Sequence, residues 1–206
     1  METFVQSLFF FLVITFSAII HEYSHGWMAD RLGDPTARLS GRLTLNPLPH
    51  IDPVGTILLP AMMYLFTQGA MLFAYAKPVP VNPFNLRNIR YGTALTAFAG
   101  PASNIIIALV FGTFVRFLPV SVFTEFLSII VLANLLLAVF NLVPIPPLDG
   151  SKILFALLSS QFNDIKVFLE AYGWFFLIFF IVFLFQSISP IIQFLFTVFT
   201  GQGGIF

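Results

Sequence analysis

The sequence has no cysteine and very few charges. Its 206 residues include 28 phenylalanines and no cysteine, so disulfide bonds, thiolate metal sites and a cysteine nucleophile are excluded. Charged side chains make up 9% of the chain, whereas an ordinary soluble domain has about 25%. Lysine plus arginine and aspartate plus glutamate both number nine, and the lack of a basic excess argues against a nucleic-acid partner. With 58% hydrophobic residues, the chain is expected to reside in the lipid bilayer.

Long uncharged runs predict the membrane spans. They occupy residues 3–20, 53–76, 91–115, 126–148 and 171–206. Because a helical span needs about 20 apolar residues, four runs can cross readily, and the run 53–76 is interrupted by Pro60 and Gly69. The last run is too long for one crossing and is divided near Pro190, so it forms one or two spans. We predict an all-α polytopic membrane protein with a single domain, residues 1–206.

The first uncharged run leads directly into the sequence HEYSH at residues 21–25. On a helix, positions i and i+4 share a face, so His21 and His25 can direct imidazole nitrogens at one zinc ion. Glu22 lies beside them and can take a proton from a water and pass it to a leaving amine. Ionisable groups near the centre of a membrane helix cost at least ~2.5–3.5 kcal/mol. The pattern therefore favours a catalytic metal over a chance match.

A catalytic zinc site needs a third protein ligand. The candidates outside the motif are His50, Asp52, Asp30, Asp34 and Asp149. Asp149 is favoured because it follows an uncharged run in NLVPIPPLDG, whose prolines break the helix and expose backbone near the membrane. The other aspartates lie in charged connectors where water suffices. His50, in NPLPHID, is predicted to be a turn residue rather than a metal or substrate contact.

Three motifs together resemble one protein family. HEYSHG, AGPASN and NLVPIPPLDG occur in successive spans, in the order typical of the site-2 protease family of intramembrane zinc metalloproteases, peptidase family M50. The resemblance covers a three-helix catalytic core at about residues 4–150, followed by C-terminal spans at about 167–206. The strings RLTLNPLPHIDPVGT and AKPVPVNP are similar to those of a short bacterial and archaeal subgroup. Unlike larger relatives, the sequence contains no inserted PDZ-like domain.

The resemblance implies an activity and a set of roles. His21, His25 and Asp149 would bind one zinc ion per chain, and Glu22 would be the general base. The expected activity is hydrolysis of peptide bonds in or near the transmembrane helix of a single-span membrane protein. One alternative is a membrane metal-binding protein or transporter that uses the same ligands; it predicts further ligands along a pathway, and the sequence has almost none facing outward. The other is a catalytically silent scaffold, which would need a damaged motif, whereas HEYSH and LDG are intact.

Two asparagines also match the family pattern. Asn141 corresponds to an asparagine thought to hold substrate, and Asn104 with Gly100 matches a Gly-x-x-x-Asn motif, so both asparagines are predicted to contact substrate. The residues themselves permit other uses. Asn104 can orient a metal ligand or bond between helices, and Asn141 can satisfy carbonyls freed by the nearby prolines.

Topology tests this interpretation independently, because both metal-binding motifs must lie on one side of the membrane. His25 lies at the end of one span and Asp149 follows another, so an even number of crossings separates them. The runs within 91–148 supply two, and the run 53–76 is therefore expected to be re-entrant. Of the nine basic residues, only Arg116 then faces the other side. The positive-inside rule predicts a multi-pass cell-membrane protein with its active site toward the cytoplasm and its N-terminus outside.

The connector between the first two core spans is predicted to be re-entrant or β-like on the cytoplasmic side. Hydrolysis needs water, so residues 30–52 and the re-entrant run are expected to line a wet cleft. The run 38–45, RLSGRLTL, alternates enough to form a strand that pairs with an unwound substrate. An ordinary charged loop is nevertheless the favoured interpretation of this run.

Overall fold

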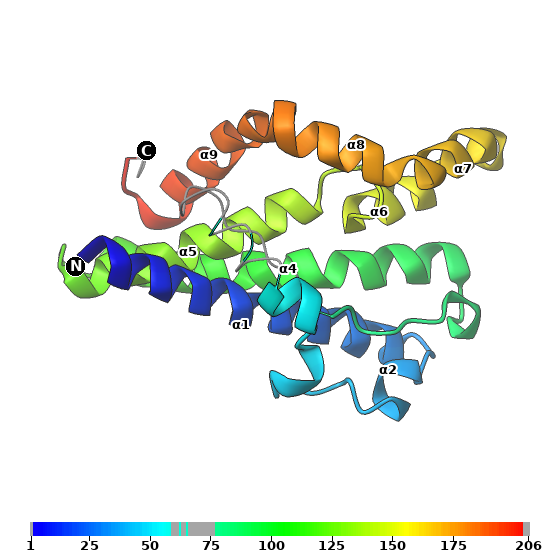
Figure 1. Cartoon of the computed structure of the whole chain (residues 1–206), viewed down its shortest axis with the longest axis horizontal. Coiled ribbons are helices and arrows are strands. Elements are labelled where there is room, and N and C mark those ends of the chain that lie inside the picture. The colour runs from blue at the N-terminus through cyan, green and yellow to red at the C-terminus, as the bar shows by residue number, and fades with distance from the viewer. Residues whose placement is uncertain (1, 59–61, 63–64, 66–76, 204–206) are drawn as a thin grey trace.

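The computed structural model describes residues 2–58, 62, 65 and 77–203, and these form helices joined by short connections (Figure 1). Four helical stretches are long and apolar enough to cross a membrane, namely Phe4–Arg31, Ile89–Phe117, Val122–Asn141 and Gly173–Thr200. They coincide with four of the five uncharged runs. No strand occurs in the described part of the chain, so the prediction of an all-α polytopic protein is confirmed.

The α-helices in chain order are α1 Glu2–Arg31, α2 Thr36–Leu39, α4 Ile89–Phe117, α5 Val122–Asn141, α6 Asp149–Leu157, α7 Asn163–Ala171, α8 Gly173–Phe179 and α9 Ser189–Thr200. Short 3-10 turns are η1 Leu48–His50, η3 Pro83–Asn85, η4 Ser160–Phe162 and η6 Phe185–Ile188. The π-helical turns are η2 Pro53–Leu58 and η5 Phe180–Leu184.

Polar caps and prolines set the ends of the core helices. The Asn88 side chain accepts a hydrogen bond from the Tyr91 amide at 3.0 Å and so begins α4. Ser121 and Thr124 form a reciprocal capping box at the start of α5. The extended Leu118 precedes a proline and ends α4, as expected because a residue before proline disfavours helical backbone.

Helices α1, α4 and α5 pack against one another and form a three-helix core (Figure 1). Helix α9 packs on α4 and α5. The buried apolar cluster lies between α4, α5 and the C-terminal helices, and consists of Ala108, Val131, Leu135, Val139, Phe180, Ile188, Ile192 and Phe196. On α1, Phe4, Leu8, Leu12 and Phe16 recur every four residues and are 69%, 50%, 47% and 53% exposed, which is the apolar stripe expected of a helix that faces lipid.

The two chain termini lie at one end of the molecule, whereas α2, α6, α7 and the start of α4 lie at the other (Figure 1). The C-terminal run forms one candidate span, bent where α8 passes through η5 and η6 into α9. Of the one or two spans that the sequence allows for this run, the described helices therefore give one candidate span. The end of α1 and the start of α6 consequently share an end of the molecule, as the topological argument requires.

The described part of the connector is helical turns and loop. The run 38–45 does not form a strand, because α2 continues to Leu39 and Gly41 then adopts a left-handed turn with φ of 66°. The favoured loop interpretation is therefore confirmed. The proposed re-entrant run begins with the π-helical η2, but 59–61, 63–64 and 66–76 lie outside the described residues, and its re-entrant course stays a prediction.

Candidate metal centre

Two histidines and one aspartate converge where α1 meets α6. The Nε2 atoms of His21 and His25 lie 3.1 Å and 3.0 Å from the same carboxylate oxygen of Asp149, Oδ2. The three side chains are buried. The i, i+4 spacing on α1 thus brings both imidazoles to one point, and the Asp149 favoured among the sequence candidates meets them there.

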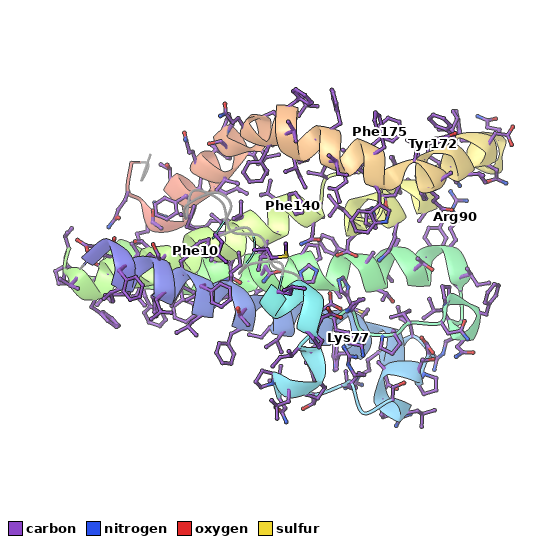
Figure 2. The ribbon with its side chains drawn as sticks, in the orientation of Figure 1. Phe10, Lys77, Arg90, Phe140, Tyr172 and Phe175 are labelled. Carbon is purple, nitrogen blue, oxygen red and sulfur yellow. The ribbon has the colours of Figure 1, made fainter. Side chains whose placement is uncertain are left out.

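Helix α6 is fixed in place at both ends. At its start, a Cβ on Gly150 would lie 2.2 Å from the Leu142 carbonyl oxygen, so only glycine permits this close approach to the end of α5. At its end, Arg90 reaches from the first turn of α4 toward α6 (Figure 2) and donates hydrogen bonds to the carbonyls of Ala156, Leu157 and Leu158. These contacts hold Asp149, the first residue of α6, against the histidines.

The outer nitrogen of each imidazole faces a hydrogen-bond acceptor. His21 Nδ1 lies 2.7 Å from Asn104 Oδ1, and His25 Nδ1 lies 2.6 Å from the Thr96 carbonyl oxygen. Because neither oxygen can donate, each Nδ1 must carry a proton to make these contacts. Both Nε2 atoms face the same acceptor, Asp149 Oδ2, and without a metal a proton on Nε2 can bridge to that oxygen. A metal cation could take the place of that proton, because it would bind the two Nε2 atoms and the carboxylate together. Two imidazoles and a carboxylate are ligands that suit zinc.

The floor of this volume is Gly100, on α4. A Cβ added to Gly100 would lie 2.5 Å from His25 Nε2 and 2.6 Å from His21 Nε2. The absence of a side chain at this position therefore keeps both metal-facing nitrogens accessible. The AGPASN motif thus contributes a gap in the helix surface at the site.

Glu22 lies in the same region but is held differently from Asp149. One of its carboxylate oxygens lies within 4.8 Å of a ring nitrogen of His21 and of a ring nitrogen of His25. Its Oε2 accepts a hydrogen bond of 2.8 Å from the backbone amide of Val79. Val79 belongs to a segment without regular secondary structure, residues 77–82, that packs along α1. A backbone donor thus fixes the Glu22 carboxylate beside the histidines.

A cavity of about 360 Å³ opens at the metal centre. Its lining combines the two histidines, Glu22 and Asp149 with groups from four other segments: Pro78, Val79, Val81 and Pro83; Thr93, Thr96 and Ala97; Asn141; and Pro147, Leu148 and Lys152. The prediction that residues 30–52 line this cleft is wrong for the described cavity. The later part of the connector lines it instead, because Val79 packs into the gap left by Gly26 on α1.

The remaining ligand candidates are engaged elsewhere. Asp30 pairs with Arg38 at 3.2 Å, and Asp52 accepts a hydrogen bond from the Gly55 amide at 2.7 Å. His50 is buried in the connector, where its Nε2 lies 2.9 Å from the Thr44 carbonyl oxygen. This is the turn environment that the sequence predicts for His50.

Asp34 is a structural carboxylate. It accepts hydrogen bonds from the Asn82 amide at 2.6 Å, the Asn85 side chain at 2.9 Å, and the amide and hydroxyl of Thr36. Burial by itself raises the pKa of the Asp34 carboxyl, but these hydrogen bonds to the charged form outweigh burial and lower the pKa below its usual value. Asp34 therefore joins the end of α1 to α2 and η3.

Asn104 and Asn141 occupy different environments. Asn104 is fully buried and contacts His21 rather than the cavity. Asn141 lines the cavity, and its side-chain nitrogen donates to the Leu137 carbonyl at 2.9 Å. Sequence reasoning missed the Val79 amide, because a backbone donor has no signature in the amino-acid sequence. It also missed Asn134, although a polar residue in an apolar span is the same signal that drew attention to Asn104.

Comparison with known proteins agrees with this geometry. The family model described as "Peptidase family M50" matches residues 118–184. The chain is 38% identical over 198 residues to "Putative zinc metalloprotease YwhC" of Bacillus subtilis, covering 90% of this chain and 83% of that protein. The chain belongs to peptidase family M50. As an M50 metalloprotease it combines four candidate membrane spans with a His-Glu-His group that could hold a metal ion.

More distant M50 relatives are longer. "Putative zinc metalloprotease Rip2" of Mycolicibacterium smegmatis is 30% identical over 148 residues, which is 68% of this chain and 55% of that protein. The Rip2 protein of Mycobacterium tuberculosis H37Rv is 31% identical over 137 residues, which is 65% of this chain and 51% of that protein. The M50 protease thus spans about half the length of the Rip2 proteins. No solved structure matches the chain.

Proposed function

We propose that this M50 metalloprotease is an intramembrane endopeptidase that cuts the transmembrane segment of single-span membrane proteins. The observation that supports this most directly is the convergence of His21, His25 and Asp149 on one point at the end of a candidate membrane span, with Glu22 beside them. A hydrolytic centre at that depth acts on peptide bonds that lie in or near the bilayer.

His21, His25 and Asp149 would hold one zinc ion. Asp149 is assigned as the third ligand because its Oδ2 lies about 3 Å from both Nε2 atoms, whereas Glu22 is anchored through one oxygen to Val79. Bound zinc would polarise the scissile carbonyl and acidify a water. Lys152 Nζ, 3.1 Å from Asp149 Oδ1, engages the carboxylate oxygen that faces away from the histidines.

Glu22 would move the proton. Because the Val79 amide fixes Oε2, the other oxygen of Glu22 is available to accept a proton from the attacking water. The same carboxyl then donates that proton to the amine that leaves when the C–N bond breaks. Burial of the surrounding side chains strengthens this charge transfer, because few water molecules screen it.

The cavity walls would bind an unwound stretch of substrate. A peptide bond in an intact helix has its carbonyl hydrogen-bonded within the helix, so the substrate must unwind locally before hydrolysis. Asn141 is suited to hold such a stretch because its Oδ1 has no hydrogen-bond partner among the described residues and can accept from a peptide amide. The Val79 and Val81 side chains supply an apolar wall.

The distribution of basic residues supports a cytoplasmic active site. Eight of the nine lie in elements at the metal-centre end of the molecule, namely Arg31, Arg38, Arg42, Lys77, Arg87, Arg90, Lys152 and Lys166. Arg116, in the last turn of α4, lies at the opposite end. The positive-inside rule then assigns the metal centre to the cytoplasmic face.

The substitution Glu22→Gln tests the proposed function. It removes the proton acceptor but keeps the metal ligands, so zinc content should stay near one per chain while cleavage of a model transmembrane peptide in detergent falls by about 10²-fold or more. Glu170→Gln is the matched control, because Glu170 is an exposed carboxylate on α7. Its activity should equal that of the unmodified protein.

Two results would contradict the proposal. Cleavage that persists in the Glu22→Gln protein would remove Glu22 from the chemistry. Zinc that binds with unchanged affinity after Asp149→Ala would remove Asp149 from the metal centre. A metal carrier, by contrast, would transport zinc across vesicle membranes, and the Glu22→Gln change would not reduce that transport.

A further inference from the structure

One buried polar side chain in the core has no role in the mechanism above. Asn134 lies in the middle of α5 and is fully buried. An amide in an apolar membrane core costs several kcal/mol if its polar atoms are unpaired. Asn134 is paired at both ends: its Nδ2 donates to the Ile130 carbonyl and its Oδ1 accepts from Asn104, each at 2.9 Å.

These contacts determine the orientation of the Asn104 amide. The Nδ2 of Asn104 donates both to Asn134 Oδ1 and to the Ser17 carbonyl oxygen at 3.3 Å. Both partners are acceptors, so the amino group of Asn104 must face them and its carbonyl oxygen must face His21. Since Asn134 already uses its own amino group on Ile130, the atom that it offers Asn104 is an oxygen.

The orientation of Asn104 in turn determines whether His21 Nδ1 carries a proton. With the Asn104 oxygen Oδ1 2.7 Å from His21 Nδ1, Nδ1 must donate, and Nε2, which lies 3.1 Å from Asp149 Oδ2, can exchange any proton of its own for a metal. If the amide turned over, its amino group would face Nδ1 and favour a ring with a proton on Nε2 alone. A metal could then bind Nε2 only if that proton moved back to Nδ1, against the amino group.

We propose that Asn134 is a positioning residue for the metal centre, which holds the Asn104 amide in the orientation that keeps a proton on His21 Nδ1 and so lets Nε2 bind the metal. His25 needs no such residue, because its Nδ1 faces a backbone carbonyl on α4 that cannot turn over. The two histidines of the motif are thus oriented by different means. This inference rests on the proposed metal site, and it assigns to α5 a function in a site built by α1, α4 and α6.

The test measures the His21 tautomer in the metal-free, full-length protein. Protein labelled with ¹⁵N-histidine reports by NMR which ring nitrogen carries the proton, and His25→Gln and His50→Gln variants assign the His21 signal. In the unmodified protein His21 Nδ1 should carry a proton. In Asn134→Leu a form with Nδ1 unprotonated and Nε2 protonated should become populated, and zinc affinity should fall by about 10–100-fold, as for other losses of outer-shell partners.

Two further variants separate positioning from packing. Val131→Ala removes buried apolar volume from the same helix, one turn before Asn134, without touching the amides, so it should change neither the tautomer nor the zinc affinity. Asn134→Asp, in the neutral acid form that burial favours, keeps an oxygen facing Asn104 and a donor facing the Ile130 carbonyl, so it should preserve both. If Asn134→Leu does not fold, Asn134→Ala removes the same acceptor and serves in its place.

The outcomes are distinct from those of the proposed function. The inference is overturned if the variants that lack the Asn134 oxygen keep the Nδ1–H form and bind zinc within twofold of the unmodified protein, or if Val131→Ala weakens zinc as much as they do. A failure of the proposed function appears instead as an unmodified protein that binds no zinc or cuts no peptide. The tautomer measurement needs neither metal nor substrate.

Discussion

At the scale of single residues, the candidate metal centre depends as much on a missing side chain as on the residues proposed as its ligands. Gly100 faces both metal-facing nitrogens from α4, and every larger residue would occupy that space. The sequence motif AGPASN identifies this glycine as part of a family pattern. Its physical role follows only from the crossing of α1 and α4, which no local pattern specifies.

We therefore expect Gly100→Ala to disrupt zinc binding. Its Cβ would lie 2.5 Å from His25 Nε2 and 2.6 Å from His21 Nε2, so the imidazoles must turn away from the metal position, and zinc affinity should fall by at least about 10-fold. Titration of metal-free protein with zinc measures this change. Gly112→Ala is the control, because Gly112 lies on the same helix against Phe199. Its thermal stability should fall while its zinc affinity is preserved.

At the same scale, sequence reasoning recovers some site residues and misses others for clear reasons. His21 and His25 follow from helical spacing, and Asp149 follows from the cost of an acid after an uncharged run. The orienting groups do not follow, because the Val79 amide and the Thr96 carbonyl are backbone atoms that every residue possesses. Asn134 gives a visible signal, a polar residue in an apolar helix, but its partner is fixed only by tertiary contact.

At the scale of secondary-structure elements, the spanning helices are predictable and the connector is not. The helices follow from uncharged runs because lipid requires every backbone group to bond within its own helix. The connector's course depends instead on side chains that bond across long sequence distances. Asp34 on one side of the connector accepts from Asn82 and Asn85 on the other, and Arg42 donates to the Lys77 carbonyl at 2.8 Å. Lys77 lies beside this part of the connector (Figure 2).

Asp34 makes the stability of the connector depend on pH. Because the folded state lowers the pKa of the Asp34 carboxyl below its ordinary value of 3.8, its ionised form stabilises the fold above that pH. The stabilisation is lost as the pH falls through the lower, folded-state pKa. Replacement of a buried hydrogen-bonded group costs about 1–3 kcal/mol, so Asp34→Asn should destabilise the connector by that order at pH 7.

Limited proteolysis of the connector in detergent, from pH 7 down to pH 3, checks this prediction. The unmodified protein should become more readily cleaved toward pH 3, whereas Asp34→Asn should be readily cleaved throughout. Asp164→Asn is the control, because Asp164 is exposed on α7, and it should behave as the unmodified protein does. Equal protection of the Asp34→Asn and unmodified connectors at pH 7 would contradict the assigned role of Asp34.

At the scale of the whole molecule, four candidate spans and the position of the charges support the proposed orientation. Helix α1 runs from the end that holds the termini to the end that holds the metal centre (Figure 1). Helix α4 then runs back toward the termini, and α5 returns to the metal-centre end. His25 and Asp149 therefore share an end whatever the orientation in the membrane. The positive-inside rule adds the direction, because Arg116 alone among the basic residues lies at the opposite end.

The absence of cysteine makes this orientation directly measurable. Single cysteines can be placed at Val120, which is 85% exposed in the turn between α4 and α5, and at the exposed Ser40 beyond α2. A membrane-impermeant maleimide applied to intact cells should label Val120→Cys and not Ser40→Cys, whereas permeabilised cells should show both labelled. The unmodified protein, which has no thiol, provides the blank. Labelling of Ser40→Cys alone in intact cells would invert the orientation and place the metal centre outside, since both positions are fixed relative to it by the same four helices.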